Sequence, residues 1–214
     1  MIKNILWDFD GVIAESVNVK TEAFYEMYLP HGEEIAQKVI DHHMAHGGVS
    51  RFEKFQHYHE NFLNIKLTPE QVMAMAVEFS ELVLAKVVAS PYIPGALEFI
   101  KNTQDKYQHF VISGTPDDEM KEIVELRKIS SYFKRIMGSP KTKTQWINEL
   151  VQEGLIDVQM SVFIGDATTD YNAAKETGTK FVLREVDYNK DIFSHYTGTR
   201  VSDFLNFHSI IEVL

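Results

Sequence analysis

The 214-residue sequence contains no cysteine. This absence excludes disulfide bonds, thiolate catalysis and zinc sites with cysteine ligands. Basic residues are in the minority, since 21 Lys and Arg stand against 31 Asp and Glu, for a formal net charge of −10. Non-specific binding to nucleic acid depends on Lys and Arg that neutralise phosphates, so the sequence predicts no nucleic-acid partner.

Long apolar segments are also missing. No stretch approaches the ~20 apolar residues of a membrane-spanning helix, and Asp8 comes too early for the apolar region of a signal peptide. We therefore expect a cytoplasmic protein, either a monomer or a homodimer, with no membrane partner. The 44% hydrophobic and 24% charged residues are ordinary for a globular chain that buries a core.

Short apolar runs predict strands that are covered on both faces. Four runs are almost continuously apolar: 5–7, 109–112, 161–164 and 180–183. A fifth run, 133–137, is a weaker candidate. Helical patterns lie between these runs, and such an alternation is typical of a parallel sheet. We predict an α/β fold with a Rossmann-like, doubly wound parallel sheet, whose ligands bind beyond the carboxyl ends of the strands.

Residues 15–90 depart from this alternation and have helical patterns throughout. Apolar side chains recur there three or four positions apart, as in Phe52, Phe55, Tyr58 and Phe62. The sequence therefore predicts an all-helical cap domain, residues 15–90, inserted into an α/β core of residues 1–14 and 91–214.

Two carboxylates follow the first predicted strand. Asp8 and Asp10 are two residues apart, so side chains of an extended chain would point the same way. Two negative charges at such a short distance repel each other unless a cation or a shared proton relieves the repulsion. The pair therefore indicates a metal site, or one carboxylate that attacks while the other handles protons.

Other predicted strand ends and helix starts offer further polar groups. The hydroxyls and amides of Ser113-Gly114-Thr115 suit an anionic oxygen, although the same residues are common in a helix-capping turn. Lys141 and Lys143 begin a predicted helix, where at least one of them is expected to be solvated. Asp166 follows a glycine at a strand end, and Asp170 follows in the next helix, whose first turn it would also stabilise.

Four ordered motifs carry a resemblance to a known family. They are Asp8-Phe9-Asp10-Gly11-Val12, the strand ending at Ser113, a lysine near position 143, and Gly165-Asp166 with Asp170 four residues after Asp166. Together they resemble the haloacid dehalogenase superfamily, in its phosphatase and β-phosphoglucomutase-like subgroup, which carries a helical cap after the first motif. The resemblance covers nearly the whole chain.

This resemblance implies a mechanism with an aspartyl-phosphate intermediate. Asp8 would be the nucleophile, and Asp10 would protonate the leaving oxygen and then deprotonate water. A lysine would balance the charge on Asp8 and the phosphate. Lys143 is favoured over Lys141 because it lies nearer the first turn of the following helix, as the lysine of the family does.

The resemblance also implies Mg²⁺ as the cofactor. Its ligands would be the Asp8 side chain, the Asp10 backbone carbonyl and the Asp166 side chain, with Asp170 acting through water or as a support. The hydroxyl and amide of Ser113-Gly114 would hold the phosphoryl oxygens.

An aspartate at position 10 points to phosphate esters within this superfamily. We therefore expect a phosphatase for a small phosphorylated metabolite, such as a sugar phosphate, with a sugar-phosphate mutase as the alternative. The loop Gly47–Arg51 resembles the substrate-reading cap loop of such enzymes, and Arg51 could clamp a second anionic group. Lys20 stands where those mutases carry histidine, which favours hydrolysis, and Lys20 is itself a candidate for substrate binding.

Two further alternatives come from different functional classes. A phospho-acceptor module would gather similar residues around Mg²⁺ but needs about half this length, and a pseudoenzyme would use the cap only to bind a partner. His42 and His46 have a spacing found in zinc sites, yet packed or solvated histidines explain them better.

Overall fold

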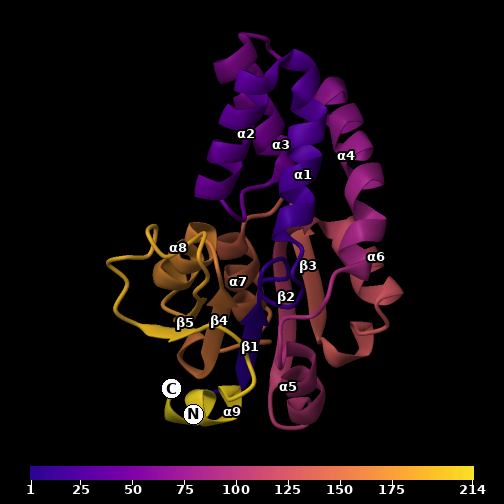
Figure 1. Cartoon of the computed structure of the whole chain (residues 1–214). Helices are drawn as coiled ribbons and strands as arrows, with labels where there is room; N and C mark the ends of the chain where they lie inside the picture. Colours follow the sequence, from indigo (N-terminus) through magenta and orange to yellow (C-terminus); the bar gives the residue numbers. More distant parts are fainter.

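The computed structural model describes all 214 residues, and its core is one six-stranded parallel sheet (Figure 1). The strand order is β3-β2-β1-β4-β5-β6. The strands are β1 (Asn4–Trp7), β2 (Gln108–Pro116), β3 (Arg135–Ser139), β4 (Ser161–Gly165), β5 (Lys180–Arg184) and β6 (Thr199–Val201). This topology confirms the predicted doubly wound α/β fold, since the chain moves outward from β1 in both directions.

Helices cover both faces of the sheet, which explains why its strands are apolar throughout. On one face lie α5 (Ala96–Thr103), α6 (Asp117–Leu126) and α9 (Phe207–Val213), and on the other lie α7 (Lys143–Gln152) and α8 (Thr168–Thr177). Strand β1 shows the alternation: Trp7 packs against Phe99 and Phe204, whereas Leu6 belongs to the core beneath α7 and α8.

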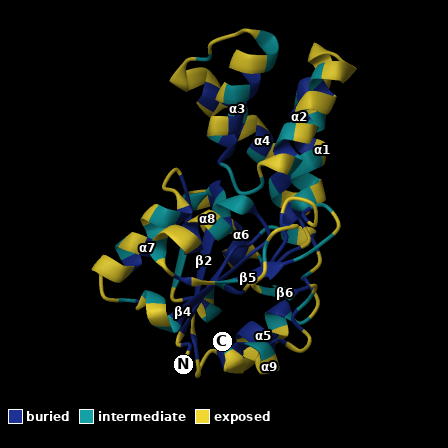
Figure 2. Ribbon diagram, turned by 90° about the vertical axis from the view of Figure 1, so that its left-hand side faces the viewer, coloured by how far each residue is buried: buried dark blue, intermediate teal, exposed yellow.

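The cap lies above the carboxyl ends of the strands in Figure 1. It consists of α1 (Val17–Tyr28), α2 (Glu33–Ala45), α3 (Arg51–Tyr58) and α4 (Pro69–Ala89), with a short 3-10 turn after α1 and a π-helical turn, His59–Leu63, after α3. Phe24, Phe55 and Phe79 form its aromatic centre, with ring centroids 4.5–6.0 Å apart. The outer faces of these helices are mostly exposed (Figure 2).

Two connectors join the cap to the core, and they are hydrogen-bonded to each other. The amide of Glu15 donates to the carbonyl of Pro91 (2.9 Å), and the amide of Ile93 donates to Ile13 (3.0 Å). Arg127 of the core donates to three carbonyls at the end of α4, including those of Val87 and Ser90. The chain therefore enters and leaves the cap at adjacent points.

The structure adds elements that the sequence did not predict. β6 is a three-residue edge strand, and α9 is a seven-residue helix that packs Phe207 against Phe99. No helix of the chain combines the length and the apolar character that crossing a membrane would require.

Candidate active site

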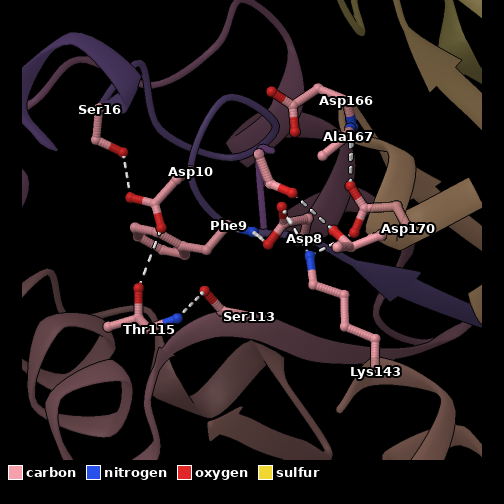
Figure 3. Close-up of polar contacts among 12 residues, drawn as sticks. Asp8, Phe9, Asp10, Ser16, Ser113, Thr115, Lys143, Asp166, Ala167 and Asp170 are labelled. Atoms are coloured by element: carbon pink, nitrogen blue, oxygen red, sulfur yellow. Dashed lines mark hydrogen bonds and ion pairs between the residues drawn. The ribbon is translucent and has the colours of Figure 1, made fainter. Parts of the chain in front are cut away.

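The carboxyl ends of β1, β2 and β4 bring the predicted motifs to one rim beneath the cap (Figure 3). Asp8 follows β1, Ser113 lies near the end of β2, and Asp166 follows β4. Parallel neighbouring strands have their carboxyl ends on the same edge, so residues far apart in the sequence meet there. Lys143 and Asp170 reach the same place from the first turns of α7 and α8.

Lys143 lies between two buried carboxylates. Its Nζ is 3.0 Å from Oδ2 of Asp8 and also forms an ion pair with Oδ1 of Asp170. The side chain of Thr142 accepts a hydrogen bond from the Gln145 amide, and this cap fixes Lys143 as the first residue of α7. Burial lowers the pKa of Lys143, but Asp170 and Asp8 more than offset this, so the pKa is raised overall and the ammonium persists.

Lys141, the other candidate lysine, lies outside the site. Its side chain is 46% exposed and is paired with Glu149 at the surface. Of the two lysines that the sequence offered as candidates, only Lys143 contacts Asp8.

Three buried carboxylates form a candidate cation site. One oxygen from each of Asp8, Asp166 and Asp170 lies within 4.8 Å of the others. Burial raises the pKa of Asp8 well above its usual value, and repulsion from Asp170 and Asp166 adds to this against the opposing charge of Lys143. Burial, followed by repulsion from Asp170, raises the pKa of Asp166 to about 7. Hard oxygen ligands under mutual repulsion fit Mg²⁺, whose charge would favour their ionised forms.

Asp170 differs from the other two carboxylates because both of its oxygens already have partners. Oδ1 pairs with Lys143, and Oδ2 accepts the amides of Asp166 (3.2 Å) and Ala167 (3.0 Å). A side chain at Gly165 would overlap Asp170, which explains the glycine before Asp166. These contacts fit the supporting role that the sequence predicted for Asp170.

Asp166 is positioned from two sides by residues that the sequence analysis did not single out. The hydroxyl of Tyr188 donates to its Oδ2, and the side-chain amide of Asn189 donates to its backbone carbonyl (2.8 Å). Both residues belong to the loop after β5, whose sequence shows no motif that would indicate this contact.

Asp10 turns toward the cap helix α1, away from the three-carboxylate cluster. Its Oδ1 accepts a hydrogen bond from Ser16 (2.6 Å), and its Oδ2 accepts from Lys20 (2.5 Å) and Thr115 (3.2 Å). Burial raises the pKa of Asp10, but the charge and hydrogen bond of Lys20 outweigh it, so the pKa is lowered. Lys20 therefore holds Asp10 in its anionic form, in addition to lining the cavity.

The site lies in a cavity between core and cap. Its volume is about 90 Å³, and since one water needs ~15 Å³, the cavity has room for several waters or a small molecule. The core contributes Asp8, Ser113 and Gly114 to the lining. The Ser113 hydroxyl is buried and accepts the amide of Thr115 (3.1 Å).

A glycine loop of the cap closes over this cavity. Thr169 of α8 donates a hydrogen bond to the carbonyl of Gly47 (3.1 Å). A Cβ at Gly48 would overlap Thr169 and lie 3.4 Å from Nζ of Lys143, and a Cβ at Gly114 would overlap the Gly48 carbonyl. Because Gly48 of the cap and Gly114 of the core have no Cβ, the cap backbone can approach the core closely.

Arg51 follows this loop, and the structure gives it a partner that the sequence did not predict. Its guanidinium makes a bidentate ion pair with Glu119 of α6, with N–O distances of 2.6 and 2.8 Å, and stacks over Phe79. Glu119 thus balances the charge that was expected to clamp a substrate anion, and the pair ties the cap to the core.

The cap histidines are packed among aromatic rings. His42 stacks between His46 and His57, with ring centroids 3.9 and 4.1 Å apart, and its edge contacts Tyr58. Burial, together with the two neighbouring imidazoles, lowers the pKa of His42 to about 4. The aspartate cluster is the only group of three or more potential metal-ligating side chains in the chain whose ligand atoms lie close together.

The comparisons with known proteins agree with this fold. Residues 5–184 match the sequence model of the haloacid dehalogenase-like hydrolases, while none of the curated proteins matches the chain. Three solved structures share the whole fold, although their sequence identities are low. A β-phosphoglucomutase from Clostridium difficile (TM-score 0.78, 19% identity) covers 99% of this chain and 96% of its own. A predicted phosphatase from Clostridium acetobutylicum (0.77, 19%) covers 100% of both chains. A predicted phosphoglycolate phosphatase from Haemophilus somnus (0.74, 16%) covers 98% and 97%.

Proposed function

Because the chain belongs to the haloacid dehalogenase-like hydrolases, we propose that it is a Mg²⁺-dependent phosphatase that hydrolyses a small phosphorylated metabolite, such as a sugar phosphate. The observation that carries this proposal is the meeting of Asp8, Lys143, Asp166 and Asp170 at one buried rim, with Asp8 open to the cavity. We also propose that the enzyme acts in the cytoplasm.

The first step is a displacement by Asp8. One carboxylate oxygen attacks the substrate phosphorus, and the bond between phosphorus and the ester oxygen breaks, leaving an aspartyl-phosphate. Lys143 and the donors of Ser113-Gly114 stabilise negative charge on the phosphoryl oxygens. Asp10 gives a proton to the departing ester oxygen, and it must first take up this proton against the charge of Lys20, which favours the anion. Bound at the aspartate cluster, Mg²⁺ would withdraw charge from the phosphoryl group.

The second step releases inorganic phosphate. Asp10, now anionic, takes a proton from a water molecule that attacks the phosphorus, and the bond to Asp8 breaks. Lys20, Ser16 and Thr115 already stabilise the anionic form of Asp10. This supports a role as the base in hydrolysis.

Metal removal tests the proposal directly. With p-nitrophenyl phosphate, we expect turnover in Mg²⁺, loss of turnover in EDTA, and recovery when excess Mg²⁺ is added. A protein that accepts phosphate on Asp8 but never turns over is a phospho-acceptor, and one that neither hydrolyses nor accepts phosphate is a pseudoenzyme. Either outcome contradicts the proposal.

A sugar-phosphate mutase is the second candidate, because the chain shares its fold and cap with a β-phosphoglucomutase. A mutase returns the phosphoryl group to another hydroxyl of the sugar, whereas a phosphatase gives it to water. ³¹P NMR of a hexose monophosphate incubated with the enzyme separates them. We expect inorganic phosphate to accumulate, and a positional isomer without phosphate release would establish the mutase.

A further inference from the structure

The cap places a buried lysine in the cavity that Asp8 lines. Lys54 of α3 lines the cavity and is only 2% exposed. Its Nζ lies 2.8 Å from Nδ1 of His43 and 3.5 Å from the His43 carbonyl, and it faces the ring of Phe24 at 5.7 Å. Burial lowers the pKa of His43 well below its usual value, so the imidazole is neutral and can accept a hydrogen bond from Lys54, but it supplies no negative charge.

Lys54 is the exception among the buried cations of this protein. Three others are paired with carboxylates: Arg51 with Glu119, Lys143 with Asp8 and Asp170, and Arg184 with Glu15. No carboxylate lies within 4.0 Å of Nζ of Lys54. A buried cation without a carboxylate is costly, and burial, aided by the charge of Lys20, lowers the pKa of Lys54 to about 7. An anion brought into the cavity would supply the missing charge.

The position of Lys54 indicates where that anion would come from. Asp8, Ser113 and Gly114 line the core side of the cavity, and Lys54 and His43 line the cap side. A substrate whose phosphoryl group lies against Asp8 therefore extends its other end toward the cap. Arg51, the other cap cation near this end, is already balanced by Glu119.

We propose that Lys54 is a specificity-determining residue that binds a second anionic group, a carboxylate or a second phosphate, at the far end of the phosphorylated substrate. The inference rests on the proposed phosphatase activity and names the substrate class: small phosphate esters with two anionic groups. The buried, uncompensated ammonium then forms its ion pair only when such a substrate is bound.

Matched substrates test this inference with Mg²⁺ present. Phosphoglycolate is compared with ethyl phosphate, which replaces its carboxylate by a methyl group, and propane-1,3-diol bisphosphate is compared with propyl phosphate. Because hydrogen bonds to charged groups are the stronger ones, we expect kcat/KM to favour at least one partner with two anionic groups by roughly tenfold or more. The two pairs distinguish a carboxylate from a second phosphate.

Two variants sharpen the experiment. Lys54→Met keeps the length of the side chain and removes its charge, so we expect the preferred substrate ratio to fall toward one. Lys38→Met is the control, since Lys38 lies exposed on α2 and pairs only with Glu34. It should leave the ratio unchanged. A folding defect would lower the activity on both members of a pair, whereas loss of anion binding changes their ratio.

The possible failures are distinguishable. If p-nitrophenyl phosphate is hydrolysed but the wild-type enzyme prefers neither of the substrates with two anionic groups, the role of Lys54 is wrong and the phosphatase proposal stands. An unchanged ratio in Lys54→Met also overturns the inference. If no phosphate ester is hydrolysed, the proposed function fails and the inference fails with it.

Discussion

The core and the cap each bury a lysine near the candidate site, but they balance its charge differently. Lys143 of the core contacts the carboxylates of Asp8 and Asp170, whereas Lys54 of the cap contacts only neutral groups of His43. The pKa of Lys143 is raised and that of Lys54 is lowered to about 7. This difference separates a lysine that is already paired with carboxylates from one whose charge, in our proposal, is balanced only when a substrate binds.

The largest expected effect comes from the nucleophile in the core. Asp8→Asn removes the attacking carboxylate while keeping the shape of the side chain, so we expect kcat to fall by about 10³-fold or more. The loss should be the same for substrates with one and with two anionic groups. Steady-state kinetics check this, with Asp187→Asn at an exposed position as the control. Retained activity would contradict the assignment of Asp8.

The next effect compares the two neighbouring lysines of the core. Lys143→Met removes a donor to the phosphoryl group and leaves two buried carboxylates without their cation. We expect kcat to fall by roughly 10²–10³-fold and the free energy of unfolding to fall by about 3 kcal/mol. Lys141→Met should change neither quantity appreciably, because its ion pair is exposed. Similar losses in the two variants would remove the distinction between Lys143 and Lys141.

The junction of cap and core gives a smaller effect. Gly48 has φ +73° and touches Thr169, so Gly48→Ala adds backbone strain and a steric overlap. We expect kcat/KM to fall by about tenfold as closure weakens. Gly154→Ala has a similar φ of +69° with no atom within 4 Å, so it carries the strain alone. Equal kinetics in the two variants would show that the close approach is unimportant.

The smallest effect concerns stability and belongs to the cap. Since the folded pKa of Lys54 is about 7 and the unfolded value is ~10.4, the unfolded chain binds more protons between these values. The contribution of Lys54 to the free energy of unfolding therefore rises with pH across that window. Below pH 7 the buried ammonium destabilises the fold to its full extent. We expect Lys54→Met to raise the free energy of unfolding by about 2 kcal/mol at pH 6 and by less at pH 9. Urea denaturation at both values checks this, with Lys38→Met as the control, and a gain independent of pH would contradict it.

The core was more predictable from the sequence than the cap site. Strand runs such as 109–112 and 161–164 are apolar throughout, and their carboxyl ends must meet in a parallel sheet, so the approach of Asp8 to Asp166 followed from topology alone. β6 was missed because Thr199–Val201 is short, half-buried and polar at an edge. The helix predicted through Phe62 instead becomes π-helical after α3.

The spacing of the cap cations in the sequence indicates that they are buried. Arg51, Lys54, Phe55 and Tyr58 are spaced as one face of a helix, and that face is the buried one. Two charged residues on an apolar helical face need partners, but the sequence does not say which. Glu119 lies in α6 of the core, and its pairing with Arg51 depends on how the cap closes. Long-range packing, which local patterns do not record, decides that one cation is balanced and the other is not.

The paired connectors at Glu15 and Pro91 also bear on how this chain folds. Strands β1 and β2 are neighbours in the sheet although the whole cap separates them in sequence, so their pairing must close a very long loop. A cap that assembles early from its local helix contacts shortens that loop to the two connectors. We expect substitutions in the aromatic centre of the cap, such as Phe55→Leu, to slow refolding of the core, and stopped-flow fluorescence of the two core tryptophans, Trp7 and Trp146, would report it.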